Sequence, residues 1–173
     1  KFPGIEIDWV IEAVFAPLLN DHSQIHEVIA LPIKKIKKEK NFALLKESYH
    51  TLKSRGSYDA VLDLQGNIKS AIVARVLSNS VIGYDKNSLR EKPATWFYKK
   101  QFAVAYDMNV IWRAIALIEK QFEMQLEIEC ILEKEPLLYF NSAAYSKAMT
   151  LWGEQDKKIL FFVGASWPSK IYP

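Results

Sequence analysis

The sequence YDAVLDLQGNIKS, at residues 58–70, places a carboxylate, an amide and an amine within seven positions, as Asp63, Gln65 and Lys69. The apolar run before Asp63 predicts a strand that is covered on both faces, and the residues after the next polar turn predict a helix. In open α/β sheets ligands bind at the carboxyl ends of such strands, so we expect these side chains at a binding site. The alternative is structural, with Asp63 capping the helix and Lys69 solvated.

A second group of candidate binding residues is a run of five lysines within residues 34–40, directly after the apolar residues 28–31. A basic cluster at the exit of a strand can bind the phosphates of nucleic acid, anionic lipid or a phosphorylated glycan, or can simply be a solvated loop or helix start. Nucleic acid is disfavoured, because no nucleic-acid-binding motif accompanies the lysines and the rest of the chain is balanced in charge.

Arg90 is a third candidate, since a guanidinium suits planar contact with carboxylate or phosphate. It lies in the polar loop 85–93 after a predicted strand, so we expect it at the same sheet edge as Lys69. Arg113 lies on a predicted amphipathic helix. For both arginines, a solvated surface position is the alternative.

Composition narrows the class of protein. Half of the 173 residues are hydrophobic and a quarter are charged, as in ordinary globular domains. No stretch reaches the roughly 20 apolar residues of a membrane span. The single cysteine, Cys130, excludes an internal disulfide and fits a reducing compartment. His22 and His26 lack partners at zinc-motif spacing, so no metal site is expected.

Strands and helices are predicted to alternate, which indicates an α/β fold built on a parallel sheet. The predicted strands are 5–10, 27–31, 60–64, 81–84 and 159–163, and the predicted helices are 12–19, 42–55, 69–77, 109–122 and 142–152. The last strand leads into a loop with Ser166 and Lys170, a plausible phosphate-binding start that matches neither the P-loop nor the dinucleotide fingerprint.

Five stretches together resemble the heptosyltransferases of lipopolysaccharide inner-core synthesis, most closely the heptosyltransferase I family. They are PGIEIDWVIE at 3–12, the lysine run, YDAVLDLQGNIKSA at 58–71, GYDKNSLREKPATWFYKK at 83–100 and GASWPSKIYP at 164–173. The Asp-x-Gln-Gly-x-x-Lys-Ser element and the Arg-Glu loop followed by Phe-Tyr are specific in combination. The stretches run in family order across most of the chain.

This resemblance implies a bacterial GT-B glycosyltransferase, in which two Rossmann-like domains face each other across a cleft. Residues 1–140 would form the N-terminal acceptor-binding domain, and residues 141–173 a linker helix and the first strand of the C-terminal nucleotide-sugar-binding domain. It further implies inverting transfer of L-glycero-D-manno-heptose from ADP-heptose to Kdo of Kdo-lipid A, without metal or cofactor. Whether the family's heptosyltransferase I or II branch applies stays open.

The resemblance also assigns residues. Those implied at the acceptor are Lys34, Lys35, Lys37, Lys38, Asp63, Gln65 and Gly66, those near the reacting sugars are Lys69, Arg90 and Arg113, and those at the donor diphosphate are Ser166 and Lys170. The family's general base, an Asp after the first strand, would precede Lys1, so we assign no catalytic base and expect the 173 residues alone to be inactive. Cations suit an anionic acceptor and a leaving ADP.

The implied protein is a cytoplasmic monomer, peripheral to the inner leaflet of the inner membrane, that binds no nucleic acid. An alternative from a different class is a non-catalytic module that binds anionic glycolipid or a membrane surface through the lysines. That alternative leaves the elements at 63–70 and 164–170 without a role.

Overall fold

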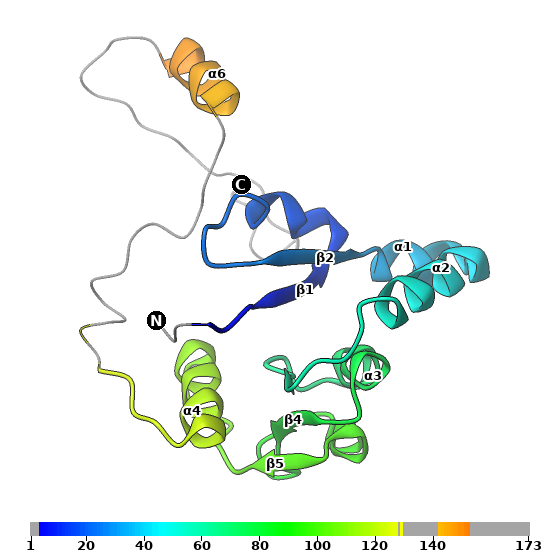
Figure 1. The fold of residues 1–173 in the computed structure, drawn as a ribbon, viewed down its shortest axis with the longest axis vertical. Helices are drawn as coiled ribbons and strands as arrows, with labels where there is room; N and C mark the ends of the chain where they lie inside the picture. The colour runs from blue at the N-terminus through cyan, green and yellow to red at the C-terminus, as the bar shows by residue number, and fades with distance from the viewer. Residues whose placement is uncertain (1–3, 128, 130–141, 153–173) are drawn as a thin grey trace, which may run out of the picture.

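The fold, in a computed structural model that describes residues 4–127, 129 and 142–152, is α/β with parallel strands, as predicted (Figure 1). The strands are β1 Asp8–Glu12, β2 Glu27–Leu31, β3 Val61–Leu62, β4 Val81–Tyr84 and β5 Lys100–Phe102. The helices are α1 Ile33–Glu39, α2 Phe42–Lys53, α3 Ile68–Leu77, α4 Val110–Phe122 and α6 Ser142–Trp152, with the 3-10 helices η1 Ala13–Leu18 and η2 Lys92–Phe97.

The strands form two parallel sheets. In the first, β1 pairs with β2, and Asp8 lies opposite Glu27. In the second, β4 lies between β3 and β5. All four β4 residues are buried, as expected of a parallel strand that is covered on both faces.

Two apolar clusters hold these elements together. The larger surrounds β4 and includes Val81, Tyr84 and, from α4, Leu117. The smaller joins Ile29 of β2 to Leu52 of α2 and to α3. Helix α3 therefore connects the two sheets. Helix α1, in contrast, has seven residues and buries none of them.

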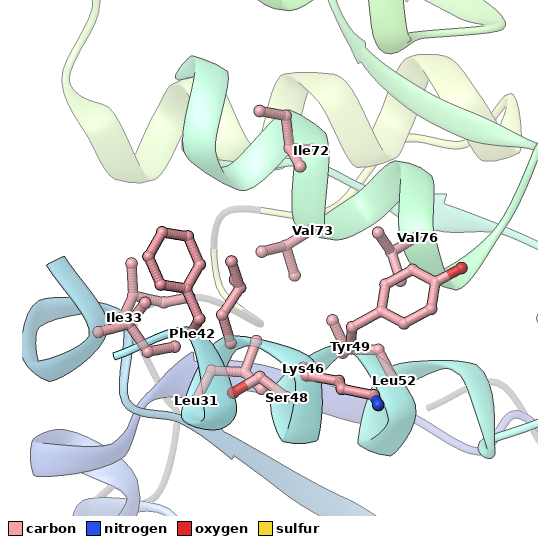
Figure 2. A pocket seen from close by; sticks show the side chains of 12 residues that line it. Leu31, Ile33, Phe42, Lys46, Ser48, Tyr49, Leu52, Ile72, Val73 and Val76 are labelled. Atoms are coloured by element: carbon pink, nitrogen blue, oxygen red, sulfur yellow. The ribbon is translucent and has the colours of Figure 1, made fainter. Parts of the chain in front are cut away.

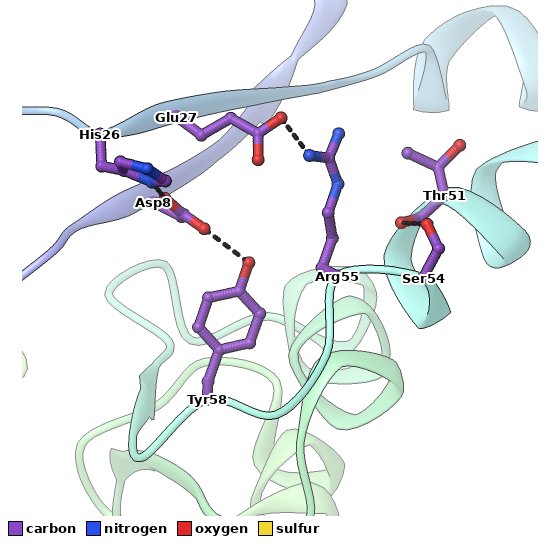
Figure 3. Close-up of polar contacts among 7 residues, drawn as sticks. All are labelled: Asp8, His26, Glu27, Thr51, Ser54, Arg55 and Tyr58. Carbon is purple, nitrogen blue, oxygen red and sulfur yellow. Dashed lines mark hydrogen bonds and ion pairs between the residues drawn. The ribbon is translucent and has the colours of Figure 1, made fainter.

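A polar cluster makes a further connection between β1, β2 and the chain that leads into β3 (Figure 3). The Asp8 carboxylate lies 2.8 Å from His26 Nδ1 and accepts a 2.7 Å hydrogen bond from the Tyr58 hydroxyl. Arg55 forms an ion pair with Glu27. Burial and the bond to Asp8 raise the pKa of Tyr58 to about 12, so its hydroxyl stays a donor.

Several predicted elements differ in their bounds. The first strand begins at Asp8, and Ile5 and Ile7 lie before it with half of their surface exposed. The predicted helix 12–19 is the shorter 3-10 helix η1, which contains Pro17. The predicted helices 42–55, 69–77, 109–122 and 142–152 correspond to α2, α3, α4 and α6, and their bounds agree to within about two residues. The predicted strand 159–163 lies outside the described residues.

The predicted strand 60–64 is shorter in the structure, where β3 is Val61–Leu62, and β5 is a strand that the sequence does not predict. β5 has two polar residues among its three, so its composition gave no strand signal. Its place comes from pairing with β4. No helix in the described ranges is long and apolar enough to cross a membrane.

Candidate functional site

The turn after β3 is held by the carboxylate of Asp63, which is 4% exposed. One oxygen accepts 3.0 Å hydrogen bonds from the backbone N–H groups of Gln65 and Gly66, and the other accepts 2.7 Å bonds from the hydroxyls of Ser70 and Tyr98. Burial and the Asp63 charge raise the pKa of Tyr98, which keeps this donor protonated. Both carboxylate oxygens are therefore used within the fold.

The start of α3 is fixed by a capping box between Asn67 and Ser70. The Asn67 side chain accepts a 2.9 Å bond from the Ser70 N–H, and the Asn67 N–H donates to Ser70 Oγ. The carboxylate of Glu91 accepts a 2.9 Å bond from the next free N–H, that of Ile68. Negative charge is favourable at a helix N-terminus, so Glu91 anchors the loop after β4 to α3.

Gly66 lets this turn lie against the loop after β4. Its φ is +66°, a conformation that favours glycine, and a Cβ there would lie 2.3 Å from Leu89 Cδ2. A side chain at this position would therefore force the Leu89 side chain to shift.

The turn, the loop and α4 surround a pocket of about 220 Å³ at the carboxyl ends of β3 and β4. Its lining is Gln65, Gly66, Asn67, Leu89, Arg90, Glu91, Tyr106 and Arg113, and we call it the arginine pocket. Such a position, at the carboxyl ends of parallel strands, is where open α/β sheets bind ligands.

Arg113 is held rigidly in this pocket. Its guanidinium carbon lies 4.7 Å from the centre of the Tyr84 ring and 5.1 Å from that of Tyr106. Its Nη2 donates a 2.5 Å hydrogen bond to the Ser88 carbonyl, whereas its buried Nε has no partner among the described residues. Burial raises the pKa of Tyr84, although Arg113 opposes this shift. The pocket thus carries a pre-positioned cation that can bind an anion.

The structure brings some of the candidate residues together and leaves others apart. Gln65, Gly66, Arg90 and Arg113 all line the arginine pocket. Lys69 is exposed on α3 and is not part of the lining, and Asp63 lies beneath the turn. Their roles toward a ligand stay predictions.

Four lining residues were not singled out from the sequence: Asn67, Leu89, Glu91 and Tyr106. Glu91 carried a signal, because it follows Arg90 directly in the Arg-Glu loop. Tyr106 carried none, since only the return of the chain from β5 to α4 brings it beside Arg113.

The lysine run forms α1, so it is a helix that directly follows β2. Its lysines, Lys34, Lys35, Lys37 and Lys38, are exposed and do not line the arginine pocket. The Lys34 N–H donates to the Glu12 carboxylate at 3.2 Å, and its Nζ lies 5.1 Å from the centre of the Phe15 ring. Ser166 and Lys170 lie outside the described residues. Within the described ranges, no cluster of three or more potential metal ligands occurs.

Comparison with known proteins defines the class. Residues 48–173 match the profile of Glycosyltransferase family 9 (heptosyltransferase). The chain is 35% identical over 172 residues to lipopolysaccharide heptosyltransferase 1 of Campylobacter coli, which covers 98% of this chain and 48% of that protein. It is 28% identical over 179 residues to the protein of the same name from Pseudomonas aeruginosa, covering 99% and 47%.

Solved structures agree. Escherichia coli heptosyltransferase WaaC with ADP-2-deoxy-2-fluoro heptose matches with a TM-score of 0.66 and 30% identity, over 72% of this chain and 41% of that chain. A family 9 glycosyl transferase from Veillonella parvula matches with a TM-score of 0.69 over 97% and 47%. At 17% identity, this second likeness concerns the fold alone.

The fold and the profile together define a glycosyltransferase of the GT-B type. The chain belongs to glycosyltransferase family 9, the heptosyltransferases, and spans about half the length of the curated relatives it matches.

Proposed function

We propose that the full-length protein transfers L-glycero-D-manno-heptose from ADP-heptose to the Kdo of Kdo-lipid A, with inversion and without a metal ion. The observation that carries this proposal is the arginine pocket, at the carboxyl ends of β3 and β4 in a family 9 chain. The similar WaaC structure, solved with an ADP-heptose analogue, supports a nucleotide-sugar donor.

The proposed reaction needs positive charge at two places. An acceptor hydroxyl gives up its proton to a base and attacks the anomeric carbon of the heptose, the bond from that carbon to the diphosphate oxygen breaks, and ADP leaves with the bonding electrons. Fixed cations can stabilise the leaving diphosphate as a metal would. The acceptor carries carboxylates and phosphates, which arginine binds in a planar, two-point manner.

Residue roles follow from this chemistry. Arg90 and Arg113 bind anionic groups of the sugars in the arginine pocket, and Gln65 and the Gly66 backbone contact the acceptor there. Lys69 approaches from the exposed first turn of α3. The lysines of α1 bind more distant anionic groups of the acceptor, and Ser166 and Lys170 bind the donor diphosphate. Asp63 positions the turn, and we assign no general base to it, because both of its oxygens already accept hydrogen bonds.

The domain assignment belongs to the same proposal. Residues 1–140 form the acceptor domain, and residues 141–173 begin the nucleotide-sugar domain. The protein works as a cytoplasmic monomer at the inner face of the inner membrane, where a lipid-linked acceptor lies.

The test is a transfer assay with full-length protein, ADP-heptose and Kdo-lipid A, in which mass spectrometry detects the added heptose. Parallel arms contain a chelator, to test metal independence, and acceptor that already carries one heptose, to separate the two branches of the family. The anomeric configuration of the product, from NMR, reports inversion. Folded protein that transfers no heptose to Kdo-lipid A would contradict the proposal, and transfer only to the acceptor that already carries heptose would assign the protein to the other branch.

Arg90→Ala supplies the matched variant. Because Arg90 is proposed to bind an anionic group, its loss should lower turnover more than tenfold. Because its side chain is exposed, the melting temperature should stay unchanged. Arg75→Ala, which removes an exposed arginine of α3 outside the pocket, should keep full turnover. Equal losses of activity in the two variants would argue against a role for the pocket.

A further inference from the structure

A second cavity, of about 420 Å³, lies between α2 and α3 and is lined almost entirely by apolar side chains (Figure 2). Tyr49 and Leu52 of α2 face Ile72, Val73 and Val76 of α3 across it. We call it the apolar groove. The proposed heptose transfer gives it no role, since none of its lining residues lines the arginine pocket.

Large apolar side chains are exposed along this groove. Phe42, the first residue of α2, is 80% exposed, and Leu45 and Tyr49 on the next turns are each nearly half exposed. Together with Ile72 of α3 they form a continuous apolar surface on neighbouring helices. Contiguous exposed apolar surface is a mark of an interaction site.

Positive charge surrounds the same surface. Residues 33–53, which include α1 and α2, contain seven lysines and only two glutamates. On α1, Ile33 and Ile36 line the groove and lysines occupy the positions between and after them. Lys46 lies in the groove lining itself. None of these lysines forms an ion pair within the part of the chain that the structure describes.

We propose that α1, α2 and the apolar groove are the surface with which this protein docks on an anionic phospholipid bilayer. The lysines of α1 meet the lipid headgroups, and acyl chains cover Phe42 and the groove. Helices with an apolar face beside lysines are typical of binding in the plane of a membrane interface. The inference rests on the proposed function in that the acceptor is a lipid and its anionic groups are assigned to the same α1 lysines, which here also meet the surrounding headgroups.

Charge complementarity favours this occupant over a second copy of the chain. Two copies that met at the groove would bring their lysine-rich helices together, and like charges repel. A bilayer with anionic headgroups matches both features of the surface.

The experiment is flotation of the full-length protein with vesicles of phosphatidylcholine, with or without phosphatidylglycerol. We expect binding to the anionic vesicles only, weakened by added salt. Phe42→Ser should bind at least fivefold less, Phe42→Leu should bind as wild type does, and Lys35→Ala/Lys38→Ala should lose most binding. The control is Trp96→Ser, because Trp96 is 84% exposed on η2 outside the groove, and it should bind normally.

Several results would overturn the inference. These are absence of binding to anionic vesicles, unchanged binding of Phe42→Ser, or an equal loss in Trp96→Ser. A dimer in sedimentation that Phe42→Ser dissociates would assign the groove to a second copy instead. A melting temperature equal to that of wild type excludes unfolding as the cause of any loss.

The vesicles contain neither Kdo nor ADP-heptose, so this test is independent of the transfer assay. Vesicle binding without heptose transfer would contradict the proposed function alone. Transfer to a water-soluble, deacylated acceptor without vesicle binding would contradict the docking surface alone.

Discussion

The hydroxyl of Tyr98 donates a 2.7 Å hydrogen bond to the carboxylate of Asp63, 35 residues earlier in the chain. Both groups are buried, and the bond joins the end of η2 to the end of β3. The other oxygen of Asp63 holds the Gln65-Gly66 turn, which lines the arginine pocket. Tyr98 therefore supports this wall of the pocket through Asp63. The arginine pocket is thus built on a buried polar network.

The first prediction concerns that bond. Tyr98→Phe should lower the free energy of unfolding by about 2 kcal/mol, because hydrogen bonds to charged groups contribute more than neutral ones and the remaining carboxylate is buried. Urea denaturation measures this loss. Tyr49→Phe is the control, since Tyr49 is nearly half exposed, and it should change little. Equal stability of the two variants would show that Asp63 does not need this donor.

The second prediction compares two glycines with positive φ. Gly56 has a φ of +83° and open space where a Cβ would lie, so Gly56→Ala should cost about 1 to 2 kcal/mol of backbone strain. Gly66→Ala should cost about 1 to 3 kcal/mol more, because its Cβ would collide with Leu89. Denaturation of both variants isolates the steric part. Equal costs would mean that the turn and the loop can move apart freely.

The third prediction concerns Arg113→Lys. A lysine keeps the charge but lacks the planar guanidinium that lies over the Tyr84 and Tyr106 rings while it donates to the Ser88 carbonyl. We expect turnover of the full-length enzyme to fall about tenfold or more, which corresponds to about 1.4 kcal/mol of transition-state stabilisation. Stability should fall by only about 1 kcal/mol. Steady-state kinetics and thermal melting measure the two effects. If this variant kept wild-type turnover, the role of the Arg113 guanidinium would be structural and not part of the reaction.

The fourth prediction is a pH dependence of stability. The bond to Asp8 raises the pKa of His26, so its contribution is present below pH 6.5 and lost as the pH rises through the raised value. Burial acts to raise the pKa of Asp8, but the bonds from His26 and Tyr58 lower it overall. The Asp8 contribution is therefore present above pH 3.8 and lost as the pH falls through the lowered value.

Both contributions coexist in mildly acidic solution. We expect the free energy of unfolding of wild type to fall from about pH 5.5 to about pH 8.5 by more than that of His26→Ala. Parallel urea titrations of the two proteins at these two pH values measure the difference. His22→Ala serves as a control for the loss of an imidazole outside the Asp8 cluster. If His26→Ala showed the same pH dependence as wild type, the bond to Asp8 would contribute nothing to it.

Much of the fold followed from hydrophobic periodicity and helix caps. Asn109 caps α4, and the apolar residues after it recur at helical spacing, so both the position and the type of this helix were predictable. The predicted strand 60–64 is longer than β3 for a physical reason. Asp63 continues the ladder with a 2.9 Å bond from its N–H to the Ile82 carbonyl, but its side chain then turns the chain out of the strand.

The candidate site was predictable only in part. The rule that ligands bind at the carboxyl ends of strands grouped Gln65 with Arg90, and both line the pocket. The same rule grouped Lys69 with them, although its place one residue into α3 directs it to an exposed face. The stacking of Tyr106 on Arg113 depends on β5, and β5 could not be read from three residues.

The contrast between β4 and α1 has a consequence for amide hydrogen exchange. β4 is buried throughout and lies between two parallel strands, so its amides should open to solvent only in global unfolding. α1 has two turns, no buried residue and a C-cap lysine, Lys40, in the left-handed conformation. Such a short helix is marginal without packing, and its amides should exchange orders of magnitude faster than those of β4. The helix that carries the lysines is thus weakly protected, and its packing on the smaller apolar cluster is through Ile33, which is only partly buried.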